Sequence, residues 1–324
     1  MIKKLLGNTR RYIYNQVEKP AVILLYHRVT ELASDPQQLA VSPSNFYEHI
    51  QLLKNKYNLL SIEEFSDLLL SHKKIPDNAC IITFDDGYAD NLLEAIPILE
   101  SLNSQALFYI TTSNLDTDKE LWWDELERII LCYDTLPGSI EIGINGRLTR
   151  YPTSSSTEKM NTYQELHPAL KYLLPENRNS ILDSLRQTIG ISATGRISHR
   201  LLTNTELVQL HRSPAAVIGA HTHNHPALSI LAYREQLHEI EQSKTILEKL
   251  VNQRIDHFSY PFGSKKDYNK DSIRASRETG FKMVCANYYD QVHSWTDIFQ
   301  VPRVLVRNWD KQAFGNFLSG CFIY

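Results

Sequence analysis

Seven short apolar segments, separated by stretches with helical spacing, constrain the fold of this chain more than any other feature. The segments are AVILLY (21–26), CIITF (80–84), ALFYI (106–110), AVIGA (216–220), HFSY (257–260), KMVCA (282–286) and RVLV (303–306). Strands that alternate with helices form parallel sheets, because each connection must cross back over the sheet. The alternation and the 324-residue length fit one α/β barrel with insertions.

Helical patterns fill the gaps between these segments. Residues 42–57 begin with Ser-Pro, and residues 61–72 begin with the Ser-x-x-Glu pattern of a capping box. The stretch 88–103 contains Pro97, which predicts a kink or a split. The longest pattern, 232–251, has apolar residues at i, i+3 and i+4.

The region from about 115 to 200 interrupts the alternation. Residues 121–134 predict a helix, 140–151 a hairpin around Asn145-Gly146, and 176–190 another helix. The polar stretch TSSSTEKMNTY (153–163) predicts a loop. Because the region has few apolar runs, we expect an α+β insertion on the rim of one barrel domain, 21–324, rather than an independent domain.

Charge and composition exclude several classes of protein. The net charge of −3 argues against general nucleic-acid binding, and no run of 18 apolar residues predicts a membrane-spanning helix. Residues 1–20 are expected to be an uncleaved basic lead-in, because the apolar stretch is too short for a secretory signal. The four cysteines form no CxxC pair, so we expect a cytoplasmic protein. A weak contact of the lead-in with a membrane surface, through Lys3, Lys4, Arg10 and Arg11, is the alternative.

Polar residues follow several of the predicted strands at the point where each strand ends. They are His27-Arg28, Asp85-Asp86, His221, His223 and His225, Pro261-Phe262-Gly263, and Arg307-Asn308-Trp309. The carboxyl ends of the strands of a parallel barrel form one rim, and the active sites of such barrels lie there. The sequence therefore predicts that these residues converge.

The adjacent carboxylates Asp85 and Asp86 are costly at the end of a buried strand, because like charges resist joint ionisation. A divalent cation would hold one of them ionised, and the other could accept a proton from a water beside the cation. Three histidines within 221–225 could supply further ligands, since zinc accepts imidazole and carboxylate together. Taken alone, Asp85-Asp86-Gly87 would favour a strand-ending turn with an aspartate cap, but the histidine cluster on the same predicted rim argues against that interpretation.

Three motifs carry a family resemblance. TFDDGY (83–88), HTHNH (221–225) and YPFG (260–263) resemble the first three motifs of the polysaccharide deacetylase family, carbohydrate esterase family 4. LLYHRV (24–29) and RVLV (303–306) are also similar to members, so the resemblance covers about 20–115 and 214–310. It implies a distorted (β/α) barrel with about seven parallel strands. It also implies a metal-dependent hydrolase that removes an acyl group from an acylated sugar.

The resemblance assigns roles to individual residues. Asp85 matches the catalytic base and Asp86 the aspartate ligand, while His221 and His225 match the two histidine ligands. His223 falls at a variable position of the motif and is not counted as a ligand. The implied cofactor is a divalent metal, with Zn²⁺ favoured and Co²⁺, Ni²⁺ or Mn²⁺ as alternatives.

The substrate side of the site is also implied. Phe262 stands where a tyrosine is common, and its backbone N–H, next to Pro261, would stabilise the oxyanion. Tyr88 and Trp309 are expected to contact the sugar. The pair 122–123 could stack on sugar faces or pack in the core, and as a helical pair at least one is expected to pack.

The chain departs from the family pattern at three places. Ser259 replaces an arginine that orients the base, and Arg303 is the candidate substitute. The last motif reads VLVRNWD (304–310) without the histidine that acts as general acid. His27 is the candidate acid, with a structural hydrogen bond as the equal alternative. The aspartate–tryptophan motif is absent, and CANYYD (285–290) occupies its region.

Three functions remain open at this point. The first is hydrolysis of an N-acetylated saccharide or sugar-linked precursor, and a cytoplasmic enzyme would meet a nucleotide-linked, lipid-linked or soluble sugar. The second is a catalytically silent carbohydrate-binding protein, suggested by the departures at Ser259 and in the last motif. The third is hydrolysis of a non-sugar amide at the same metal.

Overall fold

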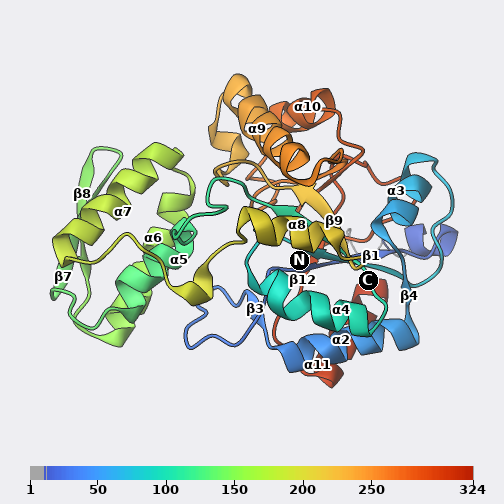
Figure 1. Ribbon diagram of the computed structural model, residues 1–324, viewed down its shortest axis with the longest axis horizontal. Coiled ribbons are helices and arrows are strands. Elements are labelled where there is room, and N and C mark those ends of the chain that lie inside the picture. Colours follow the sequence, from blue (N-terminus) through green and yellow to red (C-terminus); the bar gives the residue numbers. More distant parts are fainter. Residues whose placement is uncertain (1–10, 12, 324) are drawn as a thin grey trace.

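A curled parallel sheet forms the centre of the molecule, which is described by a computed structural model over residue 11 and residues 13–323 (Figure 1). Across that part of the chain, seven strands follow the order β11-β10-β9-β6-β5-β1-β12, and β4 pairs with β5. The strands are β1 (Val22–Tyr26), β4 (Asn58–Leu59), β5 (Ala79–Phe84), β6 (Ala106–Ile110), β9 (Ala216–Ala220), β10 (His257–Ser259), β11 (Met283–Cys285) and β12 (Val304–Leu305). All seven predicted strands are confirmed.

The two edges of the curled sheet approach the same segment of the chain. Leu24 of β1 pairs with Val304 of β12, whereas Val301, three residues earlier, forms a parallel bridge to Cys285 of β11. The segment before β12 therefore spans from one edge strand toward the other. This arrangement confirms the distorted (β/α) barrel.

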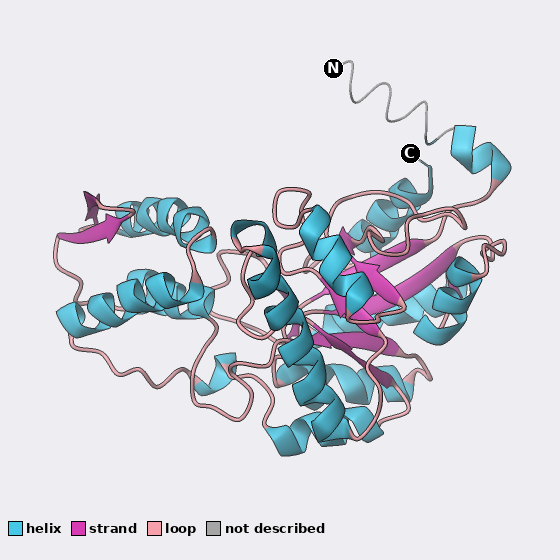
Figure 2. Cartoon of the chain, turned by 90° about the horizontal axis from the view of Figure 1, so that it is seen from above, coloured by secondary structure: helices cyan, strands magenta, loops and turns pink. Residues whose placement is uncertain are grey.

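Helices cover the outer face of the sheet, as the view from above shows (Figure 2). Strands β1, β5 and β6 are buried along their whole length, as expected for parallel strands covered on both faces. The covering segments are α2 (Pro43–Lys56), α3 (Ile62–Leu70), η1 (Asn91–Ala95), α4 (Ile96–Ser101), α8 (Asn204–Arg212), η4 (Leu228–Ile230), α9 (Tyr233–Val251), α10 (Lys270–Glu278) and α11 (Lys311–Ile323). Two short paired strands, β2 (Arg28–Val29) and β3 (Ala40–Val41), follow β1 along the chain.

The predicted helix boundaries agree with the capping contacts. Ser42 accepts a hydrogen bond from the Asn45 N–H, and Ser61 accepts one from the Glu64 N–H. The stretch 88–103 is split, as expected. Its first turn is the π-helical η1, and α4 then begins with Pro97 in its first turn, where the missing N–H of proline is tolerated.

The inserted region contains the predicted hairpin and more helix than expected. Strands β7 (Ser139–Ile144) and β8 (Arg147–Pro152) pair antiparallel around Asn145-Gly146. The loop predicted at 153–163 is wrong, because helix α6 (Ser156–Lys171) begins there. Ser155 and Glu158 form a reciprocal capping box that starts this helix, a signal that the polar composition of the stretch obscured.

The insertion has a hydrophobic cluster of its own. Its helical segments are α5 (Trp122–Glu127), η2 (Arg128–Cys132), α6, α7 (Pro175–Ile189) and η3 (Ile197–His199), and it extends to one side of the barrel (Figure 1). Leu126, Ile140, Leu166 and Leu182 are buried in this cluster. The sequence did not predict it, because these residues occur at helical and hairpin spacing rather than in runs.

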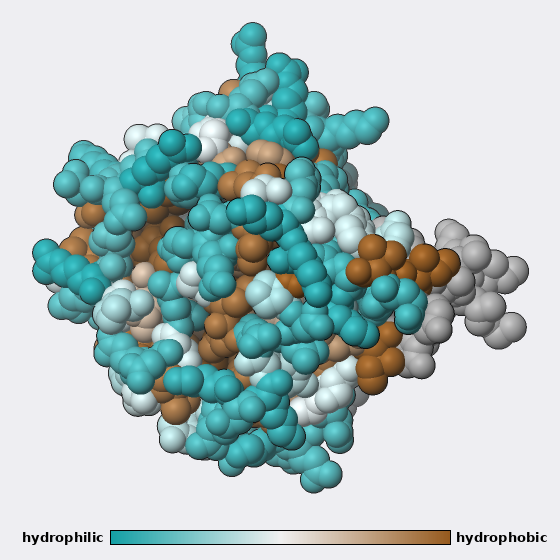
Figure 3. Space-filling model, turned by 90° about the vertical axis from the view of Figure 1, so that its right-hand side faces the viewer, coloured by the Kyte–Doolittle hydropathy of each residue, from teal (hydrophilic) through white to brown (hydrophobic). Residues whose placement is uncertain are grey.

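The lead-in is only partly described. Lys3, Lys4 and Arg10 lie outside the described residues, while Arg11 pairs with Asp290 at 3.0 Å. No helix in the described part of the chain is long and apolar enough to cross a bilayer. Figure 3 shows a mostly hydrophilic face, with some apolar side chains gathered toward its right-hand side. The membrane contact and the cytoplasmic location stay predictions.

Candidate active site

The carboxyl ends of the central strands bring the predicted site residues together. The Asp85 N–H donates to the Tyr26 carbonyl at 3.1 Å, and the His221 N–H donates to the Ile110 carbonyl at 3.0 Å. The sheet hydrogen bonds thus continue one residue beyond β5 and β9. Both backbones are fixed where the polar side chains begin.

Asp86, His221 and His225 form a compact group of candidate metal ligands. Asp86 Oδ1 lies 3.3 Å from His225 Nε2 and 3.7 Å from His221 Nε2. All three side chains are buried, and their ligating atoms lie within 4.8 Å of one another. Bonds of about 2.1 Å to a tetrahedral zinc ion separate two ligand atoms by about 3.4 Å. The three side chains therefore fit around one such ion.

The two histidines are in the form that binds a metal. Burial lowers the pKa of His221 to about 4 and the pKa of His225 to about 3, so both rings are neutral at pH 7. The Nδ1 of His221 lies 2.8 Å from the Ser259 carbonyl, and a proton on Nδ1 leaves the Nε2 lone pair for a metal. His223 instead contacts Thr112 through Nδ1 at 2.9 Å and, as expected, lies outside the group.

The two adjacent aspartates have different surroundings. Burial raises the pKa of both carboxyl groups, but the charge and hydrogen bonds of Arg303 bring the pKa of Asp85 down to about 2. The pKa of Asp86 stays raised, since burial outweighs the nearby histidine charges. Asp85 is thus compensated by Arg303 within the protein, whereas Asp86 has no such compensating arginine bond among the described residues.

Arg303 holds Asp85 in place, as the sequence predicted for a substitute arginine. Its Nη1 and Nη2 each donate to a different carboxylate oxygen of Asp85 at 2.7 Å. Nη2 also donates to the Ser259 hydroxyl at 2.6 Å, and Nε donates to the Ala286 carbonyl at 3.1 Å. Because the side chain of Ser259 is small, it leaves room for the guanidinium of Arg303, the residue that immediately precedes β12.

Several residues of the site have the left-handed backbone that side chains disfavour. The φ angles are 78° at Asp86, 63° at Thr222, 51° at His225 and 59° at Phe262. Each such conformation costs on the order of 1–2 kcal/mol and persists only when the surroundings enforce it. Gly87, with a φ of 88°, completes the turn, and a Cβ there would lie 3.1 Å from the Ile110 side chain.

His27 lies close to the two aspartates at the end of β1. Its Nδ1 is buried and has no hydrogen-bond partner among the described residues. Burial lowers the pKa of His27, although the charges of Asp86 and Asp85 oppose this shift. The ring is neutral at pH 7 and would have to take up a proton before it could donate one.

The residues predicted on the substrate side are only partly at the site. Phe262 packs its ring 4.7 Å from that of His225, and its N–H makes no hydrogen bond within residues 13–323. Pro261, beside it, is buried. Tyr88 does not fit the predicted sugar contact, because it is fully buried and its hydroxyl donates to Asp124 at 2.6 Å. The sequence could not show that the insertion covers this ring.

Trp309 lies away from the ligand group. Its ring packs against Phe317 at 4.4 Å, and its carbonyl contacts His49 Nε2 at 2.7 Å. It lines a separate hollow of about 600 Å³ together with Arg307. A direct contact with a sugar at the metal is therefore not supported for Trp309.

The insertion places two tryptophans near the candidate metal group, and one of them, Trp123, contacts a candidate ligand. The Trp123 ring lies 4.7 Å from that of His225, and Trp122 lies 6.4 Å from Phe262. Both are almost completely buried, so they pack rather than stack on a sugar. The contact of Trp123 with His225 was not predicted, because nothing in the sequence of the insertion indicates where its helices dock.

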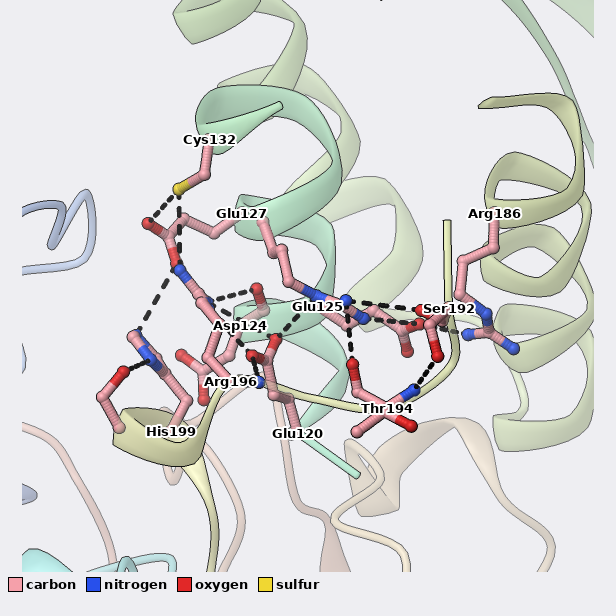
Figure 4. Close-up of polar contacts among 12 residues, drawn as sticks. Glu120, Asp124, Glu125, Glu127, Cys132, Arg186, Ser192, Thr194, Arg196 and His199 are labelled. Carbon is pink, nitrogen blue, oxygen red and sulfur yellow. Dashed lines mark hydrogen bonds and ion pairs between the residues drawn. The ribbon is translucent and has the colours of Figure 1, made fainter. Parts of the chain in front are cut away.

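A second group of buried acidic side chains lies in the insertion (Figure 4). Asp124, Glu127 and His199 have the donor atoms for a metal, but arginines surround them. Arg196 donates to Glu127 at 2.7 Å and to Glu120 at 2.8 Å. Burial, followed by the charges of nearby arginines, lowers the pKa of His199 to about 3. Glu127 is therefore paired, whereas burial raises the pKa of Asp124 to about 7 and its carboxyl group accepts a hydrogen bond from the Tyr88 hydroxyl. Because Arg196 and Tyr88 hold these side chains, we interpret this group as structural.

Comparison with known proteins agrees with this geometry. The sequence pattern of the polysaccharide deacetylase family matches residues 72–131 and 171–284, more than half of the chain. The chain belongs to the polysaccharide deacetylase family. The matched ranges contain Asp85, Asp86, His221 and His225, and residues 132–170, a little under half of the insertion, lie outside the family pattern.

Curated members of the deacetylase family are distant relatives. YxkH of Bacillus subtilis, described as a polysaccharide deacetylase, is 23% identical over 271 residues, which are 83% of this chain and 65% of YxkH. The poly-beta-1,6-N-acetyl-D-glucosamine N-deacetylase of Escherichia coli is 31% identical over 109 residues, 32% of this chain and 16% of that protein. The chain thus spans less than two thirds of the length of either relative.

Solved structures of deacetylases share the fold. The Streptococcus pyogenes deacetylase PplD, in complex with acetate, superposes with a TM-score of 0.59 at 17% identity, covering 92% of this chain and 98% of PplD. IcaB from Ammonifex degensii gives a TM-score of 0.61 at 15% identity, covering 94% and 97% of the two chains. At these identities the likeness establishes the barrel and leaves the substrate open.

Proposed function

We propose that this protein is a metal-dependent hydrolase that removes an acetyl or similar acyl group from an N-acylated sugar in a glycan or glycan precursor. One observation carries the proposal. Asp85, held ionised by Arg303, lies beside the three candidate ligands, with 3.7 Å between Asp85 Oδ2 and His221 Nε2. The name of the Escherichia coli relative, a sugar N-deacetylase, supports the same reaction class.

Asp86, His221 and His225 would hold the cation. When bound, it would polarise the acyl carbonyl and lower the pKa of a water at the site. Zinc suits two imidazoles and one carboxylate, and Co²⁺, Ni²⁺ or Mn²⁺ are the alternatives for the same ligands.

The remaining residues would move protons and stabilise charge. Asp85 accepts the proton of the attacking water, and its two hydrogen bonds to Arg303 fix the direction of the carboxylate. The free N–H of Phe262 would donate to the oxyanion that forms on the acyl oxygen. His27 is the proposed acid for the leaving nitrogen, after it has taken up a proton during the reaction.

A silent carbohydrate-binding protein is less well supported. Its main argument was the missing arginine at Ser259, and Arg303 supplies a guanidinium to Asp85 from another strand. Sugar binding alone does not require an ionised carboxylate beside a metal. Hydrolysis of a non-sugar amide uses the same residues, so only the choice of substrate separates it from the proposal.

The test is release of the acyl group from a panel of substrates. The panel contains N-acetylated and O-acetylated sugars, N-formylated sugars and simple amides, assayed before chelation, after chelation and after addition of each divalent metal. We expect release of acetate from N-acetylated sugars, and we expect this activity to be lost on chelation and restored by addition of metal. Bound metal without release from any substrate would indicate a binding protein, and release from simple amides alone would indicate an amide hydrolase.

A further inference from the structure

A hollow of about 350 Å³ opens beside the metal ligands, between the barrel and the insertion. Its lining includes Trp122 from α5, Arg178 from α7, and Asn224 and His225 from the loop after β9. Because His225 is one of the candidate ligands, a molecule bound at the metal could extend into this hollow. The wall formed by α5 and α7 belongs to the insertion.

Arg178 is a buried cation whose donors are mostly unused. Its side chain is 3% exposed, and Nε and Nη1 have no hydrogen-bond partner in the described part of the chain. Nη2 makes a long contact of 3.4 Å with the Asn224 carbonyl. The guanidinium lies 4.9 Å from the Trp122 ring, whose Nε1–H is also unpartnered. Both groups donate hydrogen bonds only, so they require an acceptor.

The acidic groups around the hollow are already paired, while Lys119, which also lines it, has no ion pair in the described part of the chain. Glu125 and Asp183 both bind Arg186, and Glu120 lies 2.8 Å from Arg196. No ion pair of Arg178 occurs among residues 13–323. Glu239, whose charge acts on Arg178, accepts hydrogen bonds from the N–H groups of His223 and Asn224.

This arrangement leaves, at the edge of the candidate metal group, a positive charge that has no ion pair in the described part of the chain and is offset only by the charges of Glu239 and Glu176. Burial lowers the pKa of Arg178 to about 10, so the guanidinium remains charged at pH 7. Burial has the largest effect on the pKa of His225, and the charge of Arg178 lowers that pKa further. A buried cation without a partner is unfavourable, and bound anionic oxygens would remove the penalty through charge-assisted hydrogen bonds.

We propose that the hollow binds a carboxylate or phosphate group of the sugar substrate, with Arg178 as its main ligand and the Trp122 N–H as a second donor. The inference rests on the proposed function, since it names the class of N-acylated sugar that the enzyme takes. Residues of the insertion would then select an anionic sugar, while residues of the barrel would carry out the hydrolysis.

The test compares binding of matched sugars to the full-length, metal-loaded protein by calorimetry. The probes are N-acetylglucosamine, its 6-phosphate and its 1-phosphate, and N-acetylmuramic acid as the carboxylate arm. Free phosphate and free acetate are the controls for binding of the anion without a sugar. We expect at least one anionic sugar to bind about 10- to 100-fold more tightly than the neutral one, as for hydrogen bonds to a charged group. Equal binding of neutral and anionic sugars would overturn the proposal.

Variants then locate the preference. Arg178→Gln should abolish it, and Arg178→Lys, which keeps the charge, should retain part of it. Arg212→Gln removes one positive charge from the end of α8, outside the hollow, and should leave the preference intact. A preference that survives in Arg178→Gln, or that Arg212→Gln abolishes equally, would place the anion elsewhere.

Acyl release from the same sugars separates this inference from the proposed function. Anion binding that depends on Arg178, without acyl release from any sugar, would sustain the site and reject the enzyme. Acyl release with no preference for anionic sugars would sustain the enzyme and reject the site.

Discussion

Arg303 and Asp85 form a two-pronged ion pair in the buried centre of the site, although 218 positions separate them in the chain. Each carboxylate oxygen of Asp85 accepts one guanidinium N–H at 2.7 Å. The pair has direct consequences for the pH dependence of the enzyme. It also explains how Ser259 can stand at the position where the family resemblance implied an arginine.

Replacing Arg303 should move the acid limb of the activity profile. Burial raises the pKa of Asp85 and Arg303 lowers it, so Arg303→Met should let the carboxyl group protonate at a higher pH. We expect kcat to fall by about 100-fold, with its acid limb shifted upward. Stability should fall by about 3–5 kcal/mol, because an unpaired charge remains buried. The measurements are kcat from pH 4 to 9 and urea unfolding.

Ser259→Ala is the matched control for Arg303. It removes the hydroxyl but keeps both bonds between Arg303 and Asp85, so the acid limb should stay in place. An unchanged pH profile in Arg303→Met would show that the arginine does not position the base.

Trp123 should act as a positioning residue for His225. His225 has no hydrogen-bond partner at Nδ1 among the described residues, and the rings of Trp123 and Phe262 each lie 4.7 Å from it. Trp123→Ala should weaken zinc binding by about 10- to 100-fold, the usual effect of losing support behind a metal ligand. Trp123→Phe should restore most of the affinity. Competition with a coloured chelator measures both, and equal affinity in all three proteins would contradict the role.

His27→Gln separates catalysis from structure at this position. If His27 donates the proton, kcat should fall by about 100- to 1,000-fold while zinc content and KM stay close to wild type. A substrate with a better leaving group should be affected less. If kcat stays unchanged and only the unfolding midpoint moves, His27 is structural.

The metal-free protein should lose stability in mild acid. Burial lowers the folded pKa of both His221 and His257 to about 4, below the value of about 6.5 expected in the unfolded chain. Their stabilising contribution is complete above pH 6.5 and is lost as the pH falls toward 4. Linkage gives on the order of 2 kcal/mol per histidine between pH 7 and pH 5.

Urea unfolding of chelated protein at pH 7 and pH 5 tests this expectation. In His257→Gln, the difference between the free energies of unfolding at pH 7 and pH 5 should shrink by the contribution of one histidine. A difference that does not change in this variant would mean that His257 is not protonated on unfolding.

The sequence predicted the site residues whose positions are set by the ends of the strands. Asp85, Asp86, His221 and His225 follow buried parallel strands, and such strands can end only at one rim. Arg303 was predicted on another ground, as the substitute for the arginine missing at Ser259, because it precedes β12 rather than following a strand. Where alternation of strands and helices sets the architecture, the residues at strand ends have defined positions.

The insertion could not be predicted in the same way. Tyr88 has the composition of a sugar-binding residue, but the insertion buries it against Asp124 and Trp123. Trp123 and Arg178 lie on helices whose docking depends on tertiary contacts and has no local pattern. The second acidic group in Figure 4 shows the same limit, since only the structure shows that Arg196 pairs with Glu127 and Glu120.

The most direct test compares Asp85→Asn with Asp86→Asn, measuring bound zinc and acetate release from an N-acetylated sugar in the same preparations. The two residues are neighbours in the chain, so both variants make the same chemical change at the end of β5. We predict that Asp85→Asn keeps about one zinc per chain and loses almost all turnover, whereas Asp86→Asn loses zinc and turnover together. Wild-type turnover in Asp85→Asn, or full zinc content in Asp86→Asn, would contradict the division of roles between the two carboxylates.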